Sequence, residues 1–204
     1  MARTLFTSRY FGDLKTPESR NSLRKLLGVS ELVFMDQSHG NTVEEVTTSN
    51  LRSGFYADAL VTSVKGIALA VLVADCVPIL LHSDSVVGAV HAGRKGMTNG
   101  IVGKTVSAMM GLGAGQIAAE IGPSICADCY QVSPEMYEAI SQDFPASRTT
   151  SMLHALDLRS GVRVQLEAAG VHVSQINICT LENPAYFSHR RNGESQRLAG
   201  VVSL

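Results

Sequence analysis

Three side chains that bind zinc in proteins occur at separate places in the chain. They are His39 in Ser-His-Gly, Cys76 in Ala-Asp-Cys-Val-Pro and His91 in Ala-Val-His-Ala-Gly. Each closes or follows an apolar run, so each is expected where a strand ends and a loop begins. Two imidazoles and one thiolate are the ligands of an open zinc site, which keeps a fourth position for water. If they converge, the chain is a candidate metal-dependent enzyme.

Two apolar segments are expected to position Cys76 and His91. Residues 66–73 read Gly-Ile-Ala-Leu-Ala-Val-Leu-Val, and the absence of alternation suits a strand buried on both faces. Residues 86–90 are rich in β-branched residues and lead directly to His91. The two segments therefore predict adjacent buried strands that carry the thiol and the imidazole.

Strand patterns alternate with helix patterns along the chain, which predicts a single α/β domain over residues 1–204. A helix is expected from Pro17, with Thr16 as its cap, Gly28 past its end and Leu23, Leu26 and Leu27 in the core. Further elements are expected as a turn at residues 93–96, helices at residues 101–109, 133 onward and 158–166, and strands at residues 118–121 and 176–178.

Composition and charge limit the kinds of molecule that the chain is expected to bind. The formal net charge is −1 with both signs interspersed, so neither nucleic acid nor a membrane surface is an expected partner. The apolar run at residues 67–73 is too short to cross a bilayer. No secretory signal pattern accompanies the four cysteines, which favours free thiols in a cytoplasmic protein. A small-molecule substrate is expected.

Seven short motifs together resemble one protein family in their order and spacing. They are Ser38-His39-Gly40, residues 57–62 (Ala-Asp-Ala-Leu-Val-Thr), 74–78 (Ala-Asp-Cys-Val-Pro), 91–93 (His-Ala-Gly), 121–126 (Ile-Gly-Pro-Ser-Ile-Cys), 129–132 (Cys-Tyr-Gln-Val), and Cys179-Thr180 followed by 187–191 (Phe-Ser-His-Arg-Arg). Over residues 31–204 the chain resembles the laccase-domain family, long labelled polyphenol oxidase and now associated with purine nucleoside phosphorylase activity. The resemblance implies a layered α/β/β/α fold with mixed sheets.

The resemblance also implies a metal and a reaction. It implies zinc, or copper, on His39, Cys76 and His91, and an enzyme that phosphorolyses adenosine, inosine and methylthioadenosine. Deamination of adenosine is implied as a second activity. Small-molecule purine nucleoside and phosphate are the expected partners, and the oligomeric state is left open.

Further site residues follow from the chemistry and from the family motifs. Arginines are suited to holding a phosphate anion. Arg9, Arg190, Arg191 and Arg197 are the candidates, and the resemblance favours Arg190 and Arg197, with His189 as a further substrate contact. Asp75, beside the thiolate, is expected either to orient a ligand histidine or to act as an acid or base. The candidate catalytic residues are Cys76, His91 and Asp75.

The chain departs from the family pattern at three places. Residues 1–30 are shorter than the usual N-terminal region, which puts one wall of the substrate pocket in question. Arg94-Lys95 stands where Trp-Arg is common after His-Ala-Gly, and Ser195-Gln196-Arg197 stands where Thr-Gly-Arg is usual. These departures leave the three metal candidates in place and bear on substrate preference.

Three other functions remain open at this stage. Cys76 and His91 could act as nucleophile and base in a hydrolase that edits peptidoglycan precursors, an activity that would survive chelation. The chain could also be a non-enzymatic nucleotide-binding module. Copper-dependent phenol oxidation is disfavoured, because multicopper chemistry needs more convergent histidines than this chain, with six in total, provides.

A second pattern of cysteines permits a structural metal site under one condition. Cys126 and Cys129 form a Cys-x-x-Cys pair, but the sequence contains no second such pair. A closed site would require Cys179 and a histidine to join them.

Overall fold

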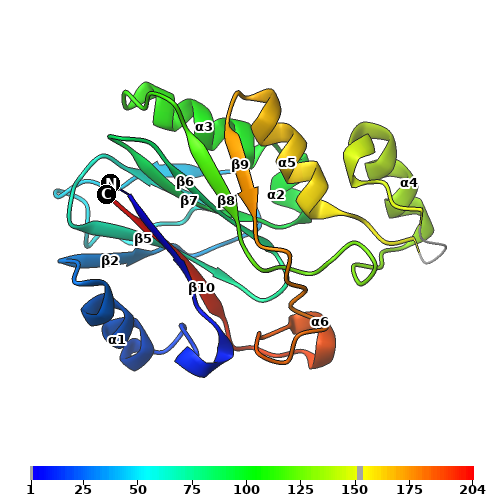
Figure 1. The fold of residues 1–204 in the computed structure, drawn as a ribbon, viewed down its shortest axis with the longest axis horizontal. Coiled ribbons are helices and arrows are strands. Elements are labelled where there is room, and N and C mark those ends of the chain that lie inside the picture. Colours follow the sequence, from blue (N-terminus) through cyan, green and yellow to red (C-terminus); the bar gives the residue numbers. More distant parts are fainter. Residues whose placement is uncertain (1, 151–153) are drawn as a thin grey trace.

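Two mixed sheets form the centre of the molecule, as the computed structural model, which describes residues 2–150 and 154–204, shows in Figure 1. The four-stranded sheet has the order β1 (Arg3–Phe6), β10 (Leu198–Ser203), β5 (Ile67–Val73) and β2 (Glu31–Phe34). The six-stranded sheet has the order β3 (Val43–Glu45), β4 (Ala59–Thr62), β7 (Val87–Ala92), β6 (Val77–His82), β8 (Ala118–Ile121) and β9 (His172–Gln175).

Helices cover the outer face of each sheet. Helix α1 (Pro17–Leu27) lies on the four-stranded sheet, where Leu23 packs with Ala68 and Ala199. Helices α3 (Ile101–Gly111) and α5 (Leu158–Ala168) lie on the six-stranded sheet. Between the sheets, apolar side chains such as Leu69 and Leu80 form a shared core. The layered α/β/β/α fold with mixed sheets is confirmed.

Shorter elements complete the chain between these layers. They are η1 (Arg9–Phe11), α2 (Arg94–Thr98), α4 (Pro134–Asp143), η2 (Pro145–Ser147) and α6 (His189–Asn192). In the part of the chain that the structure describes, no helix has the length and apolar character needed to cross a membrane.

Local sequence signals explain where several elements begin and end. The Thr16 side chain accepts a hydrogen bond from the Ser19 N–H at the start of α1, and Gly28 ends the helix with φ 66°. Of the leucines expected in the core, Leu23 is fully buried, whereas Leu26 is 68% exposed. The prediction for Leu26 is therefore wrong, because the helix presents only one narrow face to the sheet.

The two buried strands that the sequence predicts as adjacent do not pair in one sheet. Strands β5 and β7 are both present, but they belong to different sheets: they are not hydrogen-bonded to each other and instead pack face to face. The chain leaves one sheet after β5, turns through Asp75 with φ 90°, and enters the other sheet as β6. Cys76 therefore lies at a crossover between the sheets, and His91 lies within β7, not after it.

Two other sequence predictions are wrong in position. Residues 93–96 were expected as a turn, but α2 begins at Arg94. The strand expected at residues 176–178 is β9, at His172–Gln175. It pairs in parallel with β8, from Ala118↔His172 to Ile121↔Gln175, so it ends where its partner strand ends.

Candidate active site

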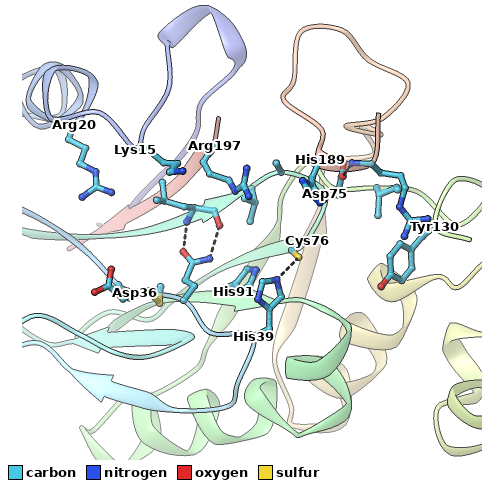
Figure 2. Close-up of a pocket in the computed structure, with 17 residues that line it drawn as sticks. Lys15, Arg20, Asp36, His39, Asp75, Cys76, His91, Tyr130, His189 and Arg197 are labelled. Atoms are coloured by element: carbon cyan, nitrogen blue, oxygen red, sulfur yellow. Dashed lines mark hydrogen bonds between the residues drawn. The ribbon is translucent and has the colours of Figure 1, made fainter. Parts of the chain in front are cut away.

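The structure brings His39, Cys76 and His91 together from three separate segments (Figure 2). One donor atom from each lies within 4.8 Å of the others. The distance from His39 Nε2 to Cys76 Sγ is 3.8 Å, and the two imidazole centroids are 4.7 Å apart with their planes at 79°. His39 comes from the loop after β2, Cys76 from the crossover and His91 from β7. Such a cluster has the donor types and spacing of an open metal site.

Asp58, directly before β4, organises two of these three side chains. Its fully buried carboxylate accepts hydrogen bonds from the backbone N–H groups of Ser38, His39 and Gly40, at 3.2, 2.9 and 2.7 Å. It also pairs with His91 Nδ1 at 2.8 Å. Because Nδ1 is engaged, Nε2 of His91 is the ring nitrogen left for a ligand.

The sequence offers Asp75 either as the residue that orients a ligand histidine or as an acid or base, and it does not single out Asp58, which is the carboxylate that pairs with His91. Asp58 lies in one of the seven motifs, but an acidic residue that precedes an apolar strand does not by itself indicate an orienting role. Asp75 has a different task. Its two oxygens accept hydrogen bonds from Thr180 Oγ1 and from the Arg190 backbone N–H, both at 2.7 Å. These bonds hold the start of α6 at the edge of the site.

The electrostatics of the site favour a thiolate beside a charged imidazole. Burial raises the pKa of the Cys76 thiol, but the hydrogen bonds and charges of His39 and His91 outweigh burial and lower it to about 6. Burial lowers the pKa of His91, but the bonds to Asp58 and Cys76 outweigh it and raise the pKa to about 9. Burial alone would raise the pKa of Asp58, yet its bonds to His91 and Gly40 hold it well below the ordinary value.

Close packing around the cluster depends on a glycine without a side chain at position 93 and on an unusual backbone conformation at His39. A Cβ on Gly93 would lie 2.9 Å from His39 Cδ2 and 3.3 Å from Cys76 Sγ, so only glycine fits beside the two side chains. His39 itself has φ 62°, which is uncommon for a residue with a side chain. The hydrogen bonds to Asp58 hold the His39 loop in this conformation.

A pocket of about 600 Å³ opens above the three donor residues. The charged and titratable side chains that line it come from separate parts of the chain. The apolar side chains that line it come from β5 and neighbouring loops. It is lined by Lys15, Arg20, Met35, Asp36, Gln37, His39, Leu72, Val73, Ala74, Asp75, Cys76, His91, Ile125, Tyr130, His189, Arg190 and Arg197. Its volume is in the range of small-molecule sites, roughly 300–1,000 Å³.

Three of the five predicted substrate-contact residues line this pocket. Arg9 and Arg191 do not, and the Arg191 guanidinium donates to the carbonyls of Thr180 and Leu181. His189, Arg190 and Arg197 are present. Arg9 is turned to other partners: its guanidinium pairs with Glu194 at 2.6 Å and stacks on the Phe187 ring at 4.7 Å. The Arg9 guanidinium therefore supports the loop around α6.

The structure adds pocket residues that the sequence prediction had missed. Lys15 and Arg20 line the pocket from the N-terminal segment, so this segment does supply a wall. Gln37 exchanges two hydrogen bonds with the Leu72 backbone, at 2.7 and 2.8 Å, and thereby extends the edge of β5. A lone lysine, arginine or glutamine in a loop carries no pattern that would have identified these roles.

Tyr130 provides an aromatic wall next to a guanidinium. The Arg190 guanidinium lies over its ring at 5.1 Å, while Arg190 Nη1 donates to the Gln131 carbonyl at 2.8 Å. Burial raises the pKa of the Tyr130 phenol, although the charges of Arg94 and Arg190 oppose that rise. The phenol therefore remains a hydrogen-bond donor at neutral pH. Arg94, which stands where the family commonly has tryptophan, lies close enough to influence it.

The fold and the site define an α/β protein with a two-histidine, one-cysteine donor set at the base of a cationic pocket. The chain belongs to the multi-copper polyphenol oxidoreductase laccase family, whose model matches residues 12–204. This result agrees with the family inferred from the seven motifs.

Relatives of the chain carry the name purine nucleoside phosphorylase. One, from Corynebacterium glutamicum, is 41% identical over 197 residues, covering 91% of this chain and 80% of the relative. Another, from Streptomyces coelicolor, is 42% identical over 196 residues, covering 91% of this chain and 81% of the relative.

Solved structures show the same fold. The chain resembles the Bacillus licheniformis hypothetical protein YfiH with a TM-score of 0.87 and 26% identity, covering 100% of this chain and 92% of that one. It resembles the Neisseria meningitidis protein NMB0706 with a TM-score of 0.84 and 27% identity, covering 100% of this chain and 94% of the other.

Proposed function

We propose that the chain is a metal-dependent purine nucleoside phosphorylase that acts on adenosine, inosine and methylthioadenosine and also deaminates adenosine. The observation that carries this proposal is the meeting of His39, Cys76 and His91 at the base of a pocket whose rim includes several cationic side chains. The names of the relatives at 41% and 42% identity support the same activity. A cytoplasmic location fits the four free cysteines.

The donor set fits a divalent metal ion. His39 and His91 offer imidazole nitrogens, Cys76 has the lowered pKa of a thiolate ligand, and Asp58 supports His91 from behind. Zinc is proposed as the native ion, with copper as the alternative, since both accept nitrogen and sulfur ligands. When bound, such an ion supplies concentrated positive charge at the base of the pocket.

The pocket offers separate features for the two proposed substrates. The purine and ribose have apolar and aromatic walls from Leu72, Ile125 and Tyr130. Phosphate has the cationic groups of Arg190 and Arg197. Guanidinium groups bind phosphate oxygens through paired, charge-assisted hydrogen bonds. Arg190 is further fixed because its backbone is bonded to Asp75 and its Nη1 to Gln131.

Phosphorolysis needs positioning and charge neutralisation more than a strong base. A phosphate oxygen forms a bond to ribose C1′, the bond from C1′ to the purine nitrogen breaks, and the base leaves with the bonding electrons. The cations hold the attacking anion in line with C1′. The neutral phenol of Tyr130 is a suitable donor to the leaving base. The products are the free base and the sugar 1-phosphate, which is ribose 1-phosphate for adenosine and inosine and methylthioribose 1-phosphate for methylthioadenosine.

The direct test incubates purified protein with adenosine, inosine or methylthioadenosine, each with and without phosphate. Chromatography then measures free base, sugar phosphate and inosine. The proposal expects phosphate-dependent release of base, loss of that release after chelation, and recovery when zinc is returned. Inosine formed from adenosine without phosphate reports the deaminase activity. Nucleoside binding without any turnover would favour the non-enzymatic binding module.

One observation favours a second candidate. Without metal, Cys76 and His91 form a thiolate–imidazolium pair backed by Asp58, which is also the arrangement of a cysteine hydrolase. Such an enzyme could act on an amide of a peptidoglycan precursor. Its activity would survive chelation and be lost on alkylation of Cys76, whereas the phosphorylase activity would be lost in both treatments.

A further inference from the structure

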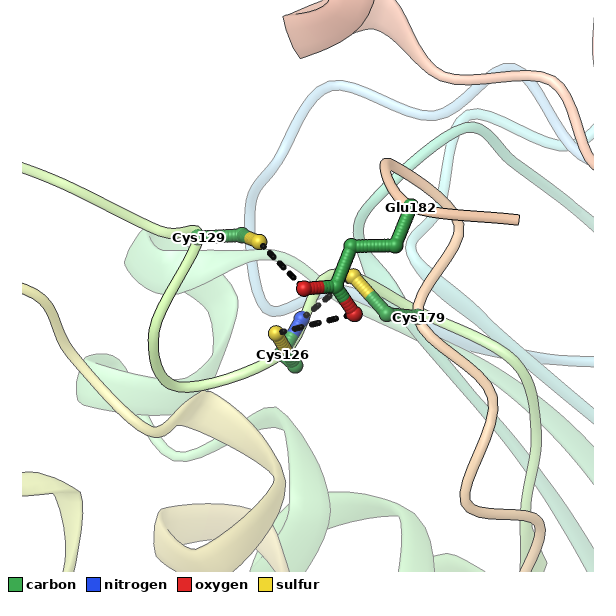
Figure 3. Close-up of side chains that lie close together, drawn as sticks. All are labelled: Cys126, Cys129, Cys179 and Glu182. Carbon is green, nitrogen blue, oxygen red and sulfur yellow. Dashed lines mark hydrogen bonds between the residues drawn. The ribbon is translucent and has the colours of Figure 1, made fainter. Parts of the chain in front are cut away.

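A second cluster of metal-binding side chains lies outside the pocket. Cys126, Cys129, Cys179 and Glu182 each place one ligand atom within 4.8 Å of the others. Figure 3 shows the carboxylate of Glu182 pointing between the three sulfur atoms. All four cysteines of the chain are free, so no disulfide joins members of this cluster. From this geometry we propose a second, structural zinc site with three thiolate ligands and one carboxylate ligand.

The distances match what a tetrahedral ion requires. Zinc–sulfur bonds of about 2.3 Å and zinc–oxygen bonds of about 2.0 Å place sulfur and oxygen ligands roughly 3.5 Å apart. The Cys129 Sγ to Glu182 Oε1 distance is 3.6 Å, and the Cys126 Sγ to Glu182 Oε2 distance is 4.0 Å. All four ligand atoms lie within 4.8 Å of one another, so a contraction of up to about 1 Å around an ion would bring them to bonding distance.

One backbone donor also supports a sulfur ligand of this cluster. The backbone N–H of Cys126 donates a hydrogen bond to Cys179 Sγ at 3.4 Å, and such bonds support metal-bound sulfur. Cys126 and Cys129 have the two-residue spacing of a zinc-binding loop. The cluster thus meets part of the condition set by the sequence: Cys179 does join the pair, but the fourth group is Glu182 and not a histidine.

The position of this cluster explains what an ion there would do. Residues 176–188, between β9 and α6, contain no helix or strand, although all of them are described. A backbone bridge between Ser124 and Cys179 holds this segment to the loop that carries the Cys-x-x-Cys pair. An ion would cross-link the two loops, one of which leads into Tyr130 and the other into α6 with His189 and Arg190. It would therefore fix two walls of the pocket without contacting the substrate.

The two sites can be separated by variants, because they share no ligand. The experiment uses protein produced without a metal-binding tag and purified under reducing conditions. Elemental analysis measures zinc in the wild type, in Cys76→Ala and in Cys129→Ser. For the second site, about one zinc per chain should remain in Cys76→Ala. Cys129→Ser should lose one equivalent relative to the wild type and become more sensitive to proteolysis within residues 176–188.

Cobalt provides a second readout, in a variant that keeps every ligand of the second cluster. Cys76→Ala retains the whole cluster, so added Co²⁺ should give thiolate-to-cobalt charge-transfer absorption, and Glu182→Ala should bind cobalt more weakly. The proposal is overturned if Cys76→Ala retains no zinc and gives no such absorption. It is equally overturned if peptide mapping of the reduced preparation finds Cys126 and Cys129 in a disulfide. Neither result depends on whether the pocket has phosphorylase activity.

Discussion

Asp58 and His91 are joined by two hydrogen bonds, one between side chains and one between backbones. Asp58 Oδ1 lies 2.8 Å from His91 Nδ1, and the His91 backbone N–H donates to the Asp58 carbonyl at 2.7 Å. The side chains are only 0% and 3% exposed. The same carboxylate shapes the loop that presents His39. A single buried aspartate therefore sets the positions of two of the three proposed metal ligands.

Replacing Asp58 by asparagine should weaken metal binding at the pocket site. An amide cannot accept as many hydrogen bonds as the carboxylate, so both histidines lose their support. Loss of such an outer-shell partner lowers metal affinity by about 10- to 100-fold. Competition with a fluorescent zinc chelator measures this change. Asp36→Asn is the matched control, because Asp36 lines the same pocket away from the ligand cluster. Equal affinities in the two variants would contradict the assignment.

Gly93→Ala should disrupt the cluster by steric contact. The added Cβ would lie 2.9 Å from His39 Cδ2, which is closer than a real Cβ contact. We expect His39 to move and phosphorolysis to fall while the protein still folds. Gly103→Ala is the control, because that exposed glycine in α3 has open space around it. In a helix interior this change should stabilise the protein by about 0.5–1 kcal/mol. Thermal unfolding and initial rates of both variants provide the test.

Arg197 and Arg9 should have separable roles. Arg197 lines the pocket, so Arg197→Ala removes a charged hydrogen-bond donor. Its net contribution of about 1.5–3 kcal/mol corresponds to roughly a 10- to 150-fold rise in KM for phosphate. Arg9 pairs instead with Glu194, so Arg9→Ala should lower the melting temperature and leave that KM unchanged. Steady-state kinetics with varied phosphate distinguish the two. A raised phosphate KM in Arg9→Ala alone would reverse these assignments.

The reactivity of Cys76 in metal-free protein should follow its lowered pKa. Burial raises this pKa, but His39 and His91 outweigh burial and set it at about 6. Below that pH the thiol is protonated and slow to react, and above it the thiolate is present and fast. Alkylation of Cys76 by iodoacetamide, followed by peptide mass mapping, should therefore reach half its maximal rate near pH 6. A midpoint near the ordinary thiol value of about 8.5 would show that the imidazoles do not stabilise the thiolate.

Much of the fold could be predicted because local signals determined it. The start and end of α1 follow from Thr16 and Gly28, whose effects act within one helical turn. The apolar runs at β5 and β7 identified buried strands, but periodicity contains no information on which sheet a strand joins. The turn at Asp75, which sends consecutive strands into different sheets, therefore had no readable signal.

In the candidate site, too, the features set by residue type could be predicted, and the features set by tertiary contacts could not. The three proposed ligands could be recognised from residue type, since few other functions use two histidines and a cysteine beside glycines. Asp58 could not be distinguished from an ordinary acidic residue before a strand, because its role depends on contacts with segments 18 to 33 positions away. Arg9 illustrates the opposite error, since its residue type suits phosphate but the fold gives it Glu194 as a partner.

The central claim is that one metal ion, held by His39, Cys76 and His91, is required for phosphorolysis. The most direct measurement compares phosphate-dependent release of adenine from adenosine by wild-type protein as purified, after chelation and after return of zinc, beside Cys76→Ala treated identically. We predict that chelation abolishes release and zinc restores it in the wild type, while the folded variant stays inactive throughout. Undiminished release by metal-free wild type, or full activity in Cys76→Ala, would contradict the claim.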